Sequence, residues 1–431
     1  MKTCSLFLLS GLMVLPTASS PDLPTGANAI GPTEVLISSS NLNTLVLSAD
    51  RETLSIGPGP RLSDVYEFLQ GSGLAVVGAR IGPVGVPGLL LSGGVSFYSY
   101  EYGLASTNGN IKGYECILAD GRIIELTATN EYSDLFWALQ GGGNSFCLVT
   151  RIDLRTLRAP STMFGAPSYG GSEVKNEFMD AVYNFVTSGH EDQKGAIIPV
   201  VQYAVGTAGP AYSSTLFYNG NSSTPEIVKG FLGDTITPLN SSTTLLPFSL
   251  GQYSKQVRPP FEEGGQSYGL RQRFHLLPIM AKREAMQLVH DSYFEAAQLQ
   301  FRDVEKGVIG MAFNPITTQL LAASNKRPGS LQGLDQQPAS WIEQTYSWKN
   351  AADDAVVDEF IQNFNTDMLR RLKIMNATGS FYYLNEADVD QPVFQNYPAT
   401  NLQRLEEIRC KYDPERVCTE LMPGGFKVAD V

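Results

Sequence analysis

The sequence has few charged residues and little positive charge. Only 17% of its 431 residues are charged, and Asp and Glu (43) outnumber Lys and Arg (31), which gives a net charge of −12. An acidic chain lacks the basic surface that nucleic acid or an anionic membrane requires, so we expect neither as a partner. The hydrophobic content of 43% is atypical of disorder or coiled coil. At about 150 residues per domain, the length predicts two to three domains.

Long hydrophobic runs and paired cysteine motifs are also missing. No stretch after the N-terminus reaches the roughly 18 apolar residues of a membrane-spanning helix, so no span is expected. The five cysteines show no metal-site spacing. The four that follow Cys4 permit two disulfides, although the apolar strand pattern around Cys116 favours a buried thiol there.

The N-terminus has the pattern of a signal peptide. Residues 1–20 have a basic start, an apolar run of about a dozen residues and a small-residue exit, which predict secretion or entry to the secretory pathway. The alternative interpretation of the apolar run is a buried N-terminal strand. Three sequons in polar stretches agree with export and are candidate N-glycan sites: Asn221, Asn240 and Asn376.

Glycine is concentrated in one part of the chain. Of 41 glycines, 17 lie between Gly57 and Gly143. Glycines three residues apart, as in residues 82–88, let the backbone approach a flat or charged group, and successive free N–H groups can hold a pyrophosphate. Two turns at a sheet edge would explain the same spacing. No P-loop lysine follows, and no third glycine completes a dinucleotide fingerprint after Gly57-Pro58-Gly59.

The remaining patterns predict an α+β protein with a change of character near residue 160. The first part favours strands and a hairpin with an Asp120-Gly121 turn, and the later part favours long amphipathic helices among strands. Expected strands cover residues 44–47, 53–56, 147–154, 197–205, 308–313 and 380–384. Expected helices cover residues 133–140, 172–187, 283–298, 352–372 and 401–412.

Several motifs together resemble the berberine-bridge-enzyme-like oxidases, whose FAD-binding fold is named after vanillyl-alcohol oxidase and p-cresol methylhydroxylase. The resemblance is strong over residues 35–155. Fungal members of secondary-metabolite pathways are the most similar in the sequence of these motifs. The motifs that carry it are Val84-Gly85-Val86-Pro87-Gly88, Ser92-Gly93-Gly94, Tyr100-Glu101-Tyr102-Gly103-Leu104, Gly141-Gly142-Gly143-Asn144, Tyr383-Leu384-Asn385 and Lys411-Tyr412-Asp413-Pro414.

The resemblance implies a two-domain FAD-linked oxidase fold in which a substrate domain has an antiparallel sheet and helices. Its FAD-binding domain would cover 21–158, its substrate domain 159–374, and residues 375–431 would return to the FAD domain. The residues that would line FAD are Pro83, Gly85, Val86, Gly88, Gly93, Gly94, Tyr102, Asn110, Val149 and Asn385. The substrate would be a small organic molecule, and dioxygen would reoxidise the flavin.

The catalytic base implied by the resemblance is a tyrosine, for which Tyr383 is the match. Some members have a second tyrosine after the asparagine, where this chain has Glu386. Tyrosine serves as a base only if its pKa falls from about 10, and Glu386 only if burial raises its own from about 4.3.

The chain departs from the family at the flavin anchor. An Arg-x-Gly-Gly-His loop, whose histidine bonds to flavin in most members, is not found, so the first lobe of the FAD domain is predicted to be missing. Ile81 stands where some members have a second, cysteine anchor, which predicts non-covalent FAD. Cys147 replaces a usual glycine.

Two other functions remain open from the sequence. A truncated FAD domain would suit a catalytically silent remnant with an interaction or structural role. A secreted hydrolase with paired carboxylates would suit the acidic composition, but no Asp or Glu pair stands out in a motif.

Overall fold

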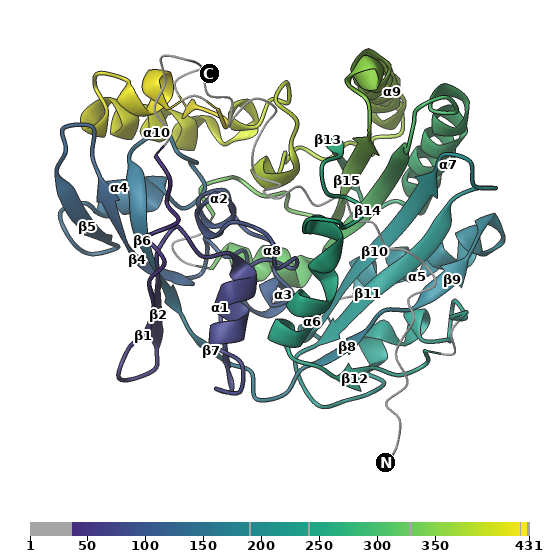
Figure 1. Cartoon of the computed structure of the whole chain (residues 1–431), viewed down its shortest axis with the longest axis horizontal. Coiled ribbons are helices and arrows are strands. Elements are labelled where there is room, and N and C mark those ends of the chain that lie inside the picture. The colour runs from purple at the N-terminus through teal and green to yellow at the C-terminus, as the bar shows by residue number, and fades with distance from the viewer. Residues whose placement is uncertain (1–36, 189–190, 240–241, 327–329, 423, 429–431) are drawn as a thin grey trace.

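A computed structural model describes residues 37–188, 191–239, 242–326, 330–422 and 424–428 (Figure 1). The predicted signal peptide and Asn240 lie outside the described residues. Asn221 and Asn376 are both exposed. In the part of the chain that the structure describes, no helix has the length and apolar content needed to cross a membrane.

The first sheet is antiparallel and has the strand order β1-β2-β6-β4-β5. Its strands are β1 (Leu45–Leu47), β2 (Thr53–Ile56), β4 (Ile111–Ile117), β5 (Ile123–Thr127) and β6 (Leu148–Arg155). The predicted hairpin is confirmed, because β4 pairs with β5 across a turn in which Gly121 has a φ of 85°. Burial alternates along β5, so one face of this edge meets solvent.

The second sheet has eight antiparallel strands and lies beside the first (Figure 1). Seven follow the order β12-β8-β11-β10-β14-β15-β13, and β9 pairs with β11. They are β8 (Met163–Gly165), β9 (Ser168–Gly170), β10 (Gly195–Ala204), β11 (Ala211–Tyr218), β12 (Leu246–Pro247), β13 (Arg271–Met280), β14 (Val308–Ile316) and β15 (Ala339–Trp348). A short pair, β3 (Leu74–Ala75) with β7 (Leu157–Arg158), stands apart.

Helices cover both faces of the second sheet. The long helices α5 (Lys175–Ser188), α7 (Arg283–Gln300) and α9 (Asp354–Ile374) pack on its outer face, where Tyr346 of β15 meets Phe360 and Tyr293. The inner face looks towards the first sheet across short helices (Figure 1). These are α1 (Leu62–Phe68), α2 (Val86–Leu91), α3 (Ser99–Tyr102), α6 (Leu250–Val257) and α8 (Thr318–Ser324).

The C-terminal helix α10 (Ala399–Tyr412) packs against α4 (Ser133–Ala138) beside the first sheet. Asp134 joins them, since its carboxylate accepts from Lys411 Nζ at 2.6 Å and Tyr412 Oη at 2.8 Å. The guanidinium of Arg404 lies 4.0 Å from the ring centroid of Trp137. Helix α10 is thereby fixed against α4.

The strand expected over residues 380–384 is absent from the described chain. The segment pairs with the edge of the second sheet only near Thr378, opposite Ile279. Farther along this edge, the Gln391 carboxamide accepts from Leu276 N–H at 2.9 Å and donates to Leu276 C=O at 2.7 Å. Residues 380–384 instead leave the edge, and Tyr383 packs on Trp341 with ring centroids 5.3 Å apart. This prediction was wrong because a side chain, rather than a strand, occupies the edge.

Candidate active site

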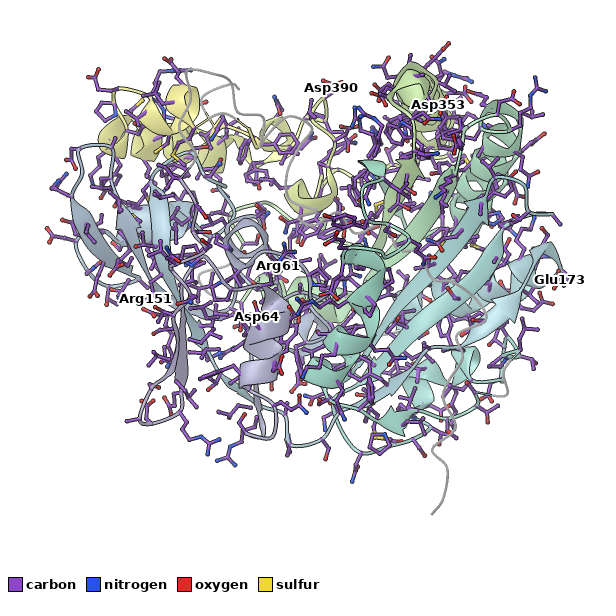
Figure 2. The ribbon with its side chains drawn as sticks, viewed as in Figure 1. Arg61, Asp64, Arg151, Glu173, Asp353 and Asp390 are labelled. Atoms are coloured by element: carbon purple, nitrogen blue, oxygen red, sulfur yellow. The ribbon has the colours of Figure 1, made fainter. Side chains whose placement is uncertain are left out.

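The first glycine loop is held by backbone hydrogen bonds at the start of α1. Leu62 N–H donates to Val84 C=O at 3.0 Å, and Ser63 N–H donates to Gly82 C=O at 2.8 Å. The Arg61 guanidinium donates to Pro83 C=O at 2.8 Å. Figure 2 shows Arg61 at the centre of the molecule, between the two sheets. The predicted residues Pro83, Gly85, Val86 and Gly88 therefore belong to a loop and helix start of fixed shape.

The second glycine loop requires glycine on conformational grounds. Gly93 and Gly94 have φ values of 115° and 82°, which side-chain-bearing residues rarely adopt. Their carbonyl groups accept from Ser106 and Ala105 N–H, both at 2.8 Å. A Cβ on Gly94 would lie 2.6 Å from Ala105 Cβ. The backbone here is packed too closely for any side chain.

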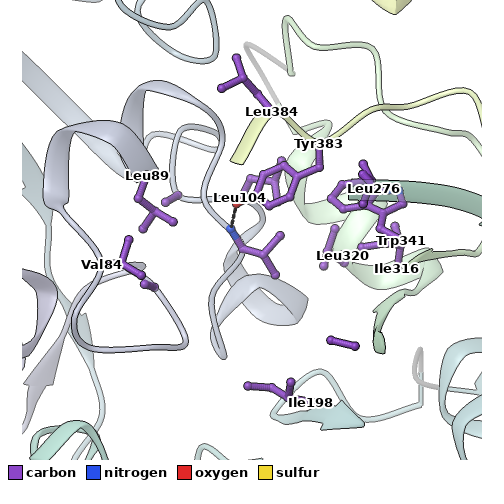
Figure 3. Packing of buried hydrophobic residues seen from close by; sticks show 14 of the residues in the cluster. Val84, Leu89, Leu104, Ile198, Leu276, Ile316, Leu320, Trp341, Tyr383 and Leu384 are labelled. Carbon is purple, nitrogen blue, oxygen red and sulfur yellow. Dashed lines mark hydrogen bonds between the residues drawn. The ribbon is translucent and has the colours of Figure 1, made fainter. Parts of the chain in front are cut away.

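Tyr383 and Asn385 contact this loop from the C-terminal segment. Asn385 lies in the short 3₁₀ turn η5 (Leu384–Glu386), and Tyr383 directly precedes that turn. Tyr383 Oη accepts from Val95 N–H at 2.8 Å, which Figure 3 shows, and from Asn385 Nδ2 at 2.8 Å. Asn385 Nδ2 also lies 3.3 Å from Leu89 C=O. The structure thus brings together Tyr383, Asn385, Gly93 and Gly94, which are far apart in the sequence.

Two buried carboxamide oxygens beside this loop have no hydrogen-bond partner among the described residues. One is Asn385 Oδ1, and the other is Gln332 Oε1. The Gln332 Nε2 donates to Ser92 C=O at 3.1 Å and to Tyr397 Oη at 3.2 Å. Gln332 Oε1 lies close to the second glycine loop, since a Cβ added to Gly93 would be 2.9 Å from it. Buried acceptors without donors are costly, so these two oxygens suit a ligand that donates N–H groups. The pyrimidine ring of a flavin carries such an N–H, and the residues present fit it.

Three other predicted cofactor residues lie on or near the first sheet: Tyr102 ends α3, Asn110 precedes β4, and Val149 is in β6. None of them hydrogen-bonds to Asn385 in the described chain. Asn110 is fully paired: its amide donates to Tyr102 and Leu104 carbonyls, both at 2.9 Å, and accepts from Arg155 at 2.7 Å. Burial and the neighbouring Glu101 raise the pKa of Tyr102 to about 12. Val149 is buried on β6 opposite Cys116. Asn110 therefore fixes the turn between the second glycine loop and β4.

Cys147 is buried directly before β6. Its pKa is raised well above the ordinary value by burial, and further by the adjacent Cys116 thiol. All four described cysteines, Cys116, Cys147, Cys410 and Cys418, are free thiols, so the structure contains neither of the disulfides that their number permits. Within the described ranges, no three His, Cys, Asp or Glu residues form a cluster that could hold a metal.

Glu386 is tied into a buried network that sequence reasoning missed. Its Oε1 lies 3.3 Å from Arg80 Nη2, and its Oε2 accepts from Asn314 Nδ2 at 2.7 Å. Arg80 Nη1 also donates to Asn314 Oδ1 at 2.6 Å. Only 10% of the Arg80 side chain and 7% of the Glu386 side chain are exposed. Both oxygens of Glu386 therefore bind protein groups, and the network joins the segment before the first glycine loop to β14 and η5.

The two-sheet α+β fold, the glycine loops and the unpaired buried amide acceptors fit a flavin-binding enzyme. The comparisons agree with this assignment. Residues 11–127 match a family described as FAD binding domain. The FAD-dependent monooxygenase prx3 of Penicillium roqueforti is 30% identical over 437 residues, which cover 96% of this chain and 80% of the relative. The chain belongs to the berberine-bridge-enzyme-like family of FAD-linked oxidoreductases.

A second relative agrees with that family, and a solved structure shares the fold. The bifunctional solanapyrone synthase of Alternaria solani is 30% identical over 394 residues, covering 91% of this chain and 73% of the relative. A solved structure of berberine bridge enzyme, C166A variant, superimposes with a TM-score of 0.67 at 17% identity and covers 89% of this chain and 79% of that chain. The second likeness shows the fold alone.

These findings confirm the fold class, the cofactor FAD and the enzyme assignment. The protein is an FAD-dependent oxidoreductase of the secondary-metabolism type. No finding supports a silent remnant better than an enzyme. The roles of individual site residues, the signal peptide and the N-glycans stay predictions.

Proposed function

We propose that this enzyme oxidises a small organic molecule and transfers the electrons to dioxygen. The observation that carries the proposal is the pair of unpaired buried acceptors, Asn385 Oδ1 and Gln332 Oε1, beside backbone that only glycine can form. The names of the relatives add support, since a xylooligosaccharide oxidase shares the fold with a TM-score of 0.66 and was solved with xylobiose. Bound FAD supplies a two-electron acceptor for a hydride that leaves a substrate carbon.

In this proposal individual residues of the chain have separate roles. Asn385 would accept a hydrogen bond from the flavin pyrimidine, and Tyr383 orients Asn385 through the bond between them. The backbone at Gly93 and Gly94 would line the cofactor site next to Asn385 and Gln332. Arg80 and Asn314 fix the Glu386 carboxyl group by direct hydrogen bonds to its two oxygens. Tyr383 remains the predicted base.

FAD titration tests the cofactor site. The purified full chain should bind FAD with quenching of flavin fluorescence, and Asn385→Ala should weaken binding by roughly tenfold, the value of one buried hydrogen bond. Asn363→Ala, on the exposed surface of α9, is the matched control and should bind like the wild type. Equal affinity in both variants would remove Asn385 from the site.

Dioxygen as acceptor can be tested without knowing the substrate. The holoenzyme is reduced anaerobically with dithionite, freed of excess reductant and mixed with aerated buffer. We expect the flavin absorption to return and one hydrogen peroxide to form per flavin. Flavin that stays reduced under these conditions would show that another acceptor is used.

We also propose that FAD is held without a covalent bond. Ile81, at the position of one family anchor, is an aliphatic side chain and cannot form a thioether. Acid precipitation of the holoenzyme should leave all flavin in the supernatant, whereas yellow precipitate would contradict the proposal.

We also propose that the protein enters the secretory pathway. Asn221 and Asn376 are exposed and can accept glycans. Endoglycosidase treatment of the protein expressed in a fungal host should lower its mass, and Asn221→Gln with Asn376→Gln should reduce that change.

A further inference from the structure

A pocket of about 630 Å³, here called the α1–α6 pocket, lies between the end of α1 and the start of α6. Figure 1 shows these two helices side by side, and an ion pair between Glu67 and Lys255 joins them at 2.5 Å. One wall comes from α1 and the turn that follows it, and the opposite wall comes from the segment between β12 and α6. No described residue of the proposed flavin site lines this pocket. It is therefore a separate site between the two parts of the chain.

The α1–α6 pocket has the lining of a site for a neutral ring compound. Its most buried lining residues are apolar or aromatic: Tyr66, Leu69, Tyr98 and Met163. The other side chains around it include amides and hydroxyl groups, those of Gln70, Gln252, Ser249 and Thr162. Among the described residues that line it, none carries a charge, so an ionic ligand would find no counter-charge. Aromatic faces combined with amides and hydroxyl groups suit a sugar.

Tyr98 gives an independent sign that this pocket takes a polar ligand. Only 2% of Tyr98 is exposed, and its ring is fixed against Phe217 with ring centroids 5.2 Å apart. Its hydroxyl group makes no hydrogen bond to another described residue, whereas the hydroxyl group of the neighbouring Tyr66 donates to Ala79 C=O. A buried hydroxyl group without a partner is costly. Tyr98 therefore suits a ligand with which it can hydrogen-bond.

Asn221 lines the same pocket and is exposed. Its loop follows β11 and is fixed on both sides of the asparagine. Asn219 Nδ2 donates to Glu101 Oε2 at 3.0 Å, and Ser223 C=O accepts from Leu245 N–H at 2.7 Å. Asn221 is also the acceptor of a predicted sequon. A sugar attached to this asparagine would start at the α1–α6 pocket.

We propose that Asn221 carries an N-glycan whose first two N-acetylglucosamine units pack into the α1–α6 pocket. The inference rests on the proposed entry to the secretory pathway. In the transfer, the Asn221 amide nitrogen loses a proton and bonds to C1 of the first sugar, while a lipid-linked diphosphate leaves that carbon. The sugar hydroxyl and acetamido groups then pair with Tyr98 and the surrounding amides. The glycan thereby links the two walls of the pocket.

Two substitutions within the sequon separate the sugar from the asparagine that bears it. Ser223→Ala removes the acceptor sequence and leaves Asn221 in place, whereas Ser222→Ala keeps the acceptor sequence intact. Each full-length holoprotein is secreted from a fungal host, and glycopeptide mass spectrometry measures occupancy at Asn221 and Asn376. We expect Ser222→Ala to melt like the wild type. Ser223→Ala should melt about 2–4 °C lower with unchanged flavin content.

Release of the glycans from the folded protein gives a second measurement, with Asn376 as the internal reference. Asn376 is an exposed sequon asparagine that does not line the α1–α6 pocket. An endoglycosidase that cuts between the first two sugars should act roughly tenfold more slowly at Asn221, because the sugars must first leave the pocket. The two rates should be equal after denaturation.

Free diacetylchitobiose distinguishes an attached sugar from a free one. It should raise the melting temperature of Ser223→Ala and leave that of the glycosylated wild type unchanged, since the wild-type pocket is filled. A shift in the wild type would show that the pocket takes a free sugar instead, and would overturn the proposal.

The other outcomes separate this inference from those on which it rests. Equal release rates at the two sites of the folded protein, or an unchanged melting temperature in Ser223→Ala, would overturn it. A glycan on Asn376 with none on Asn221 would do the same. Absence of glycan from both asparagines would overturn the proposed entry to the secretory pathway together with this inference. Absence of flavin from a protein that shows the expected shifts would overturn the proposed function alone.

Discussion

The two sides of the active site are built in different ways. On the side of the first sheet, main-chain groups form the surface, because Gly93 and Gly94 adopt conformations closed to other residues. On the side of the second sheet, side chains such as Asn314, Trp341 and Glu343 project from adjacent strands. The proposed cofactor side is therefore constrained by backbone shape, whereas the proposed substrate side can change one side chain at a time.

The largest expected effect comes from the network that joins the two sides. Arg80→Ala leaves Glu386 buried and without its cation, so the free energy of unfolding should fall by about 3–5 kcal/mol. Urea denaturation measures this. The control is Arg122→Ala, which breaks an exposed pair with Asp120 and should leave the free energy of unfolding nearly unchanged. Similar losses in both variants would show that the buried network of Arg80, Asn314 and Glu386 contributes no more to stability than an exposed ion pair does.

A substitution on the backbone side should have the next largest effect. Gly94→Ala combines a strained φ with a contact to Ala105, and should destabilise the protein by roughly 3 kcal/mol and weaken FAD binding. Gly109→Ala has a φ of 67° but no atom within 4 Å of the added Cβ. It should cost about 1 kcal/mol and leave FAD binding intact. If both variants lose FAD equally, close packing is not the constraint.

The substrate side should respond to pH. The pKa of Glu343 is about 7 in the folded chain against an ordinary 4.5, so the folded state holds the proton more tightly and loses stability as pH rises between these values. Glu343→Gln removes that loss. At about pH 8 the variant should be more stable than the wild type by up to about 3 kcal/mol, and near pH 4 the two should agree. Thermal denaturation at both pH values measures the difference, and a pH-independent one would contradict the burial of Glu343.

The smallest expected effect is that of Tyr383→Phe. The change removes the acceptor for Val95 N–H and for Asn385 Nδ2, which should cost about 1–2 kcal/mol in unfolding and lower FAD affinity severalfold. Because Tyr383 is the predicted base, reduction of the bound flavin by substrate should fall further than FAD affinity. A fall confined to affinity would assign it to positioning alone.

The sequence predicted the backbone side better than the side-chain side. Glycine in a left-handed conformation has few substitutes, so Gly93, Gly94 and Gly121 stand out in the sequence. The network of Arg80, Asn314 and Glu386 joins positions 234 and 72 residues apart, and no local pattern indicates such pairing. Glu343 lies in a strand that is buried on both faces, where alternation gives no signal.

Gln391 has a consequence for how the molecule behaves at high concentration. β13 ends the second sheet, and an unpaired edge strand is a template on which another chain can add. By binding both main-chain groups of Leu276, the Gln391 carboxamide occupies the middle of that edge as a one-residue mimic of a strand. We expect a single polar side chain placed in this way to hinder edge-to-edge association of two copies.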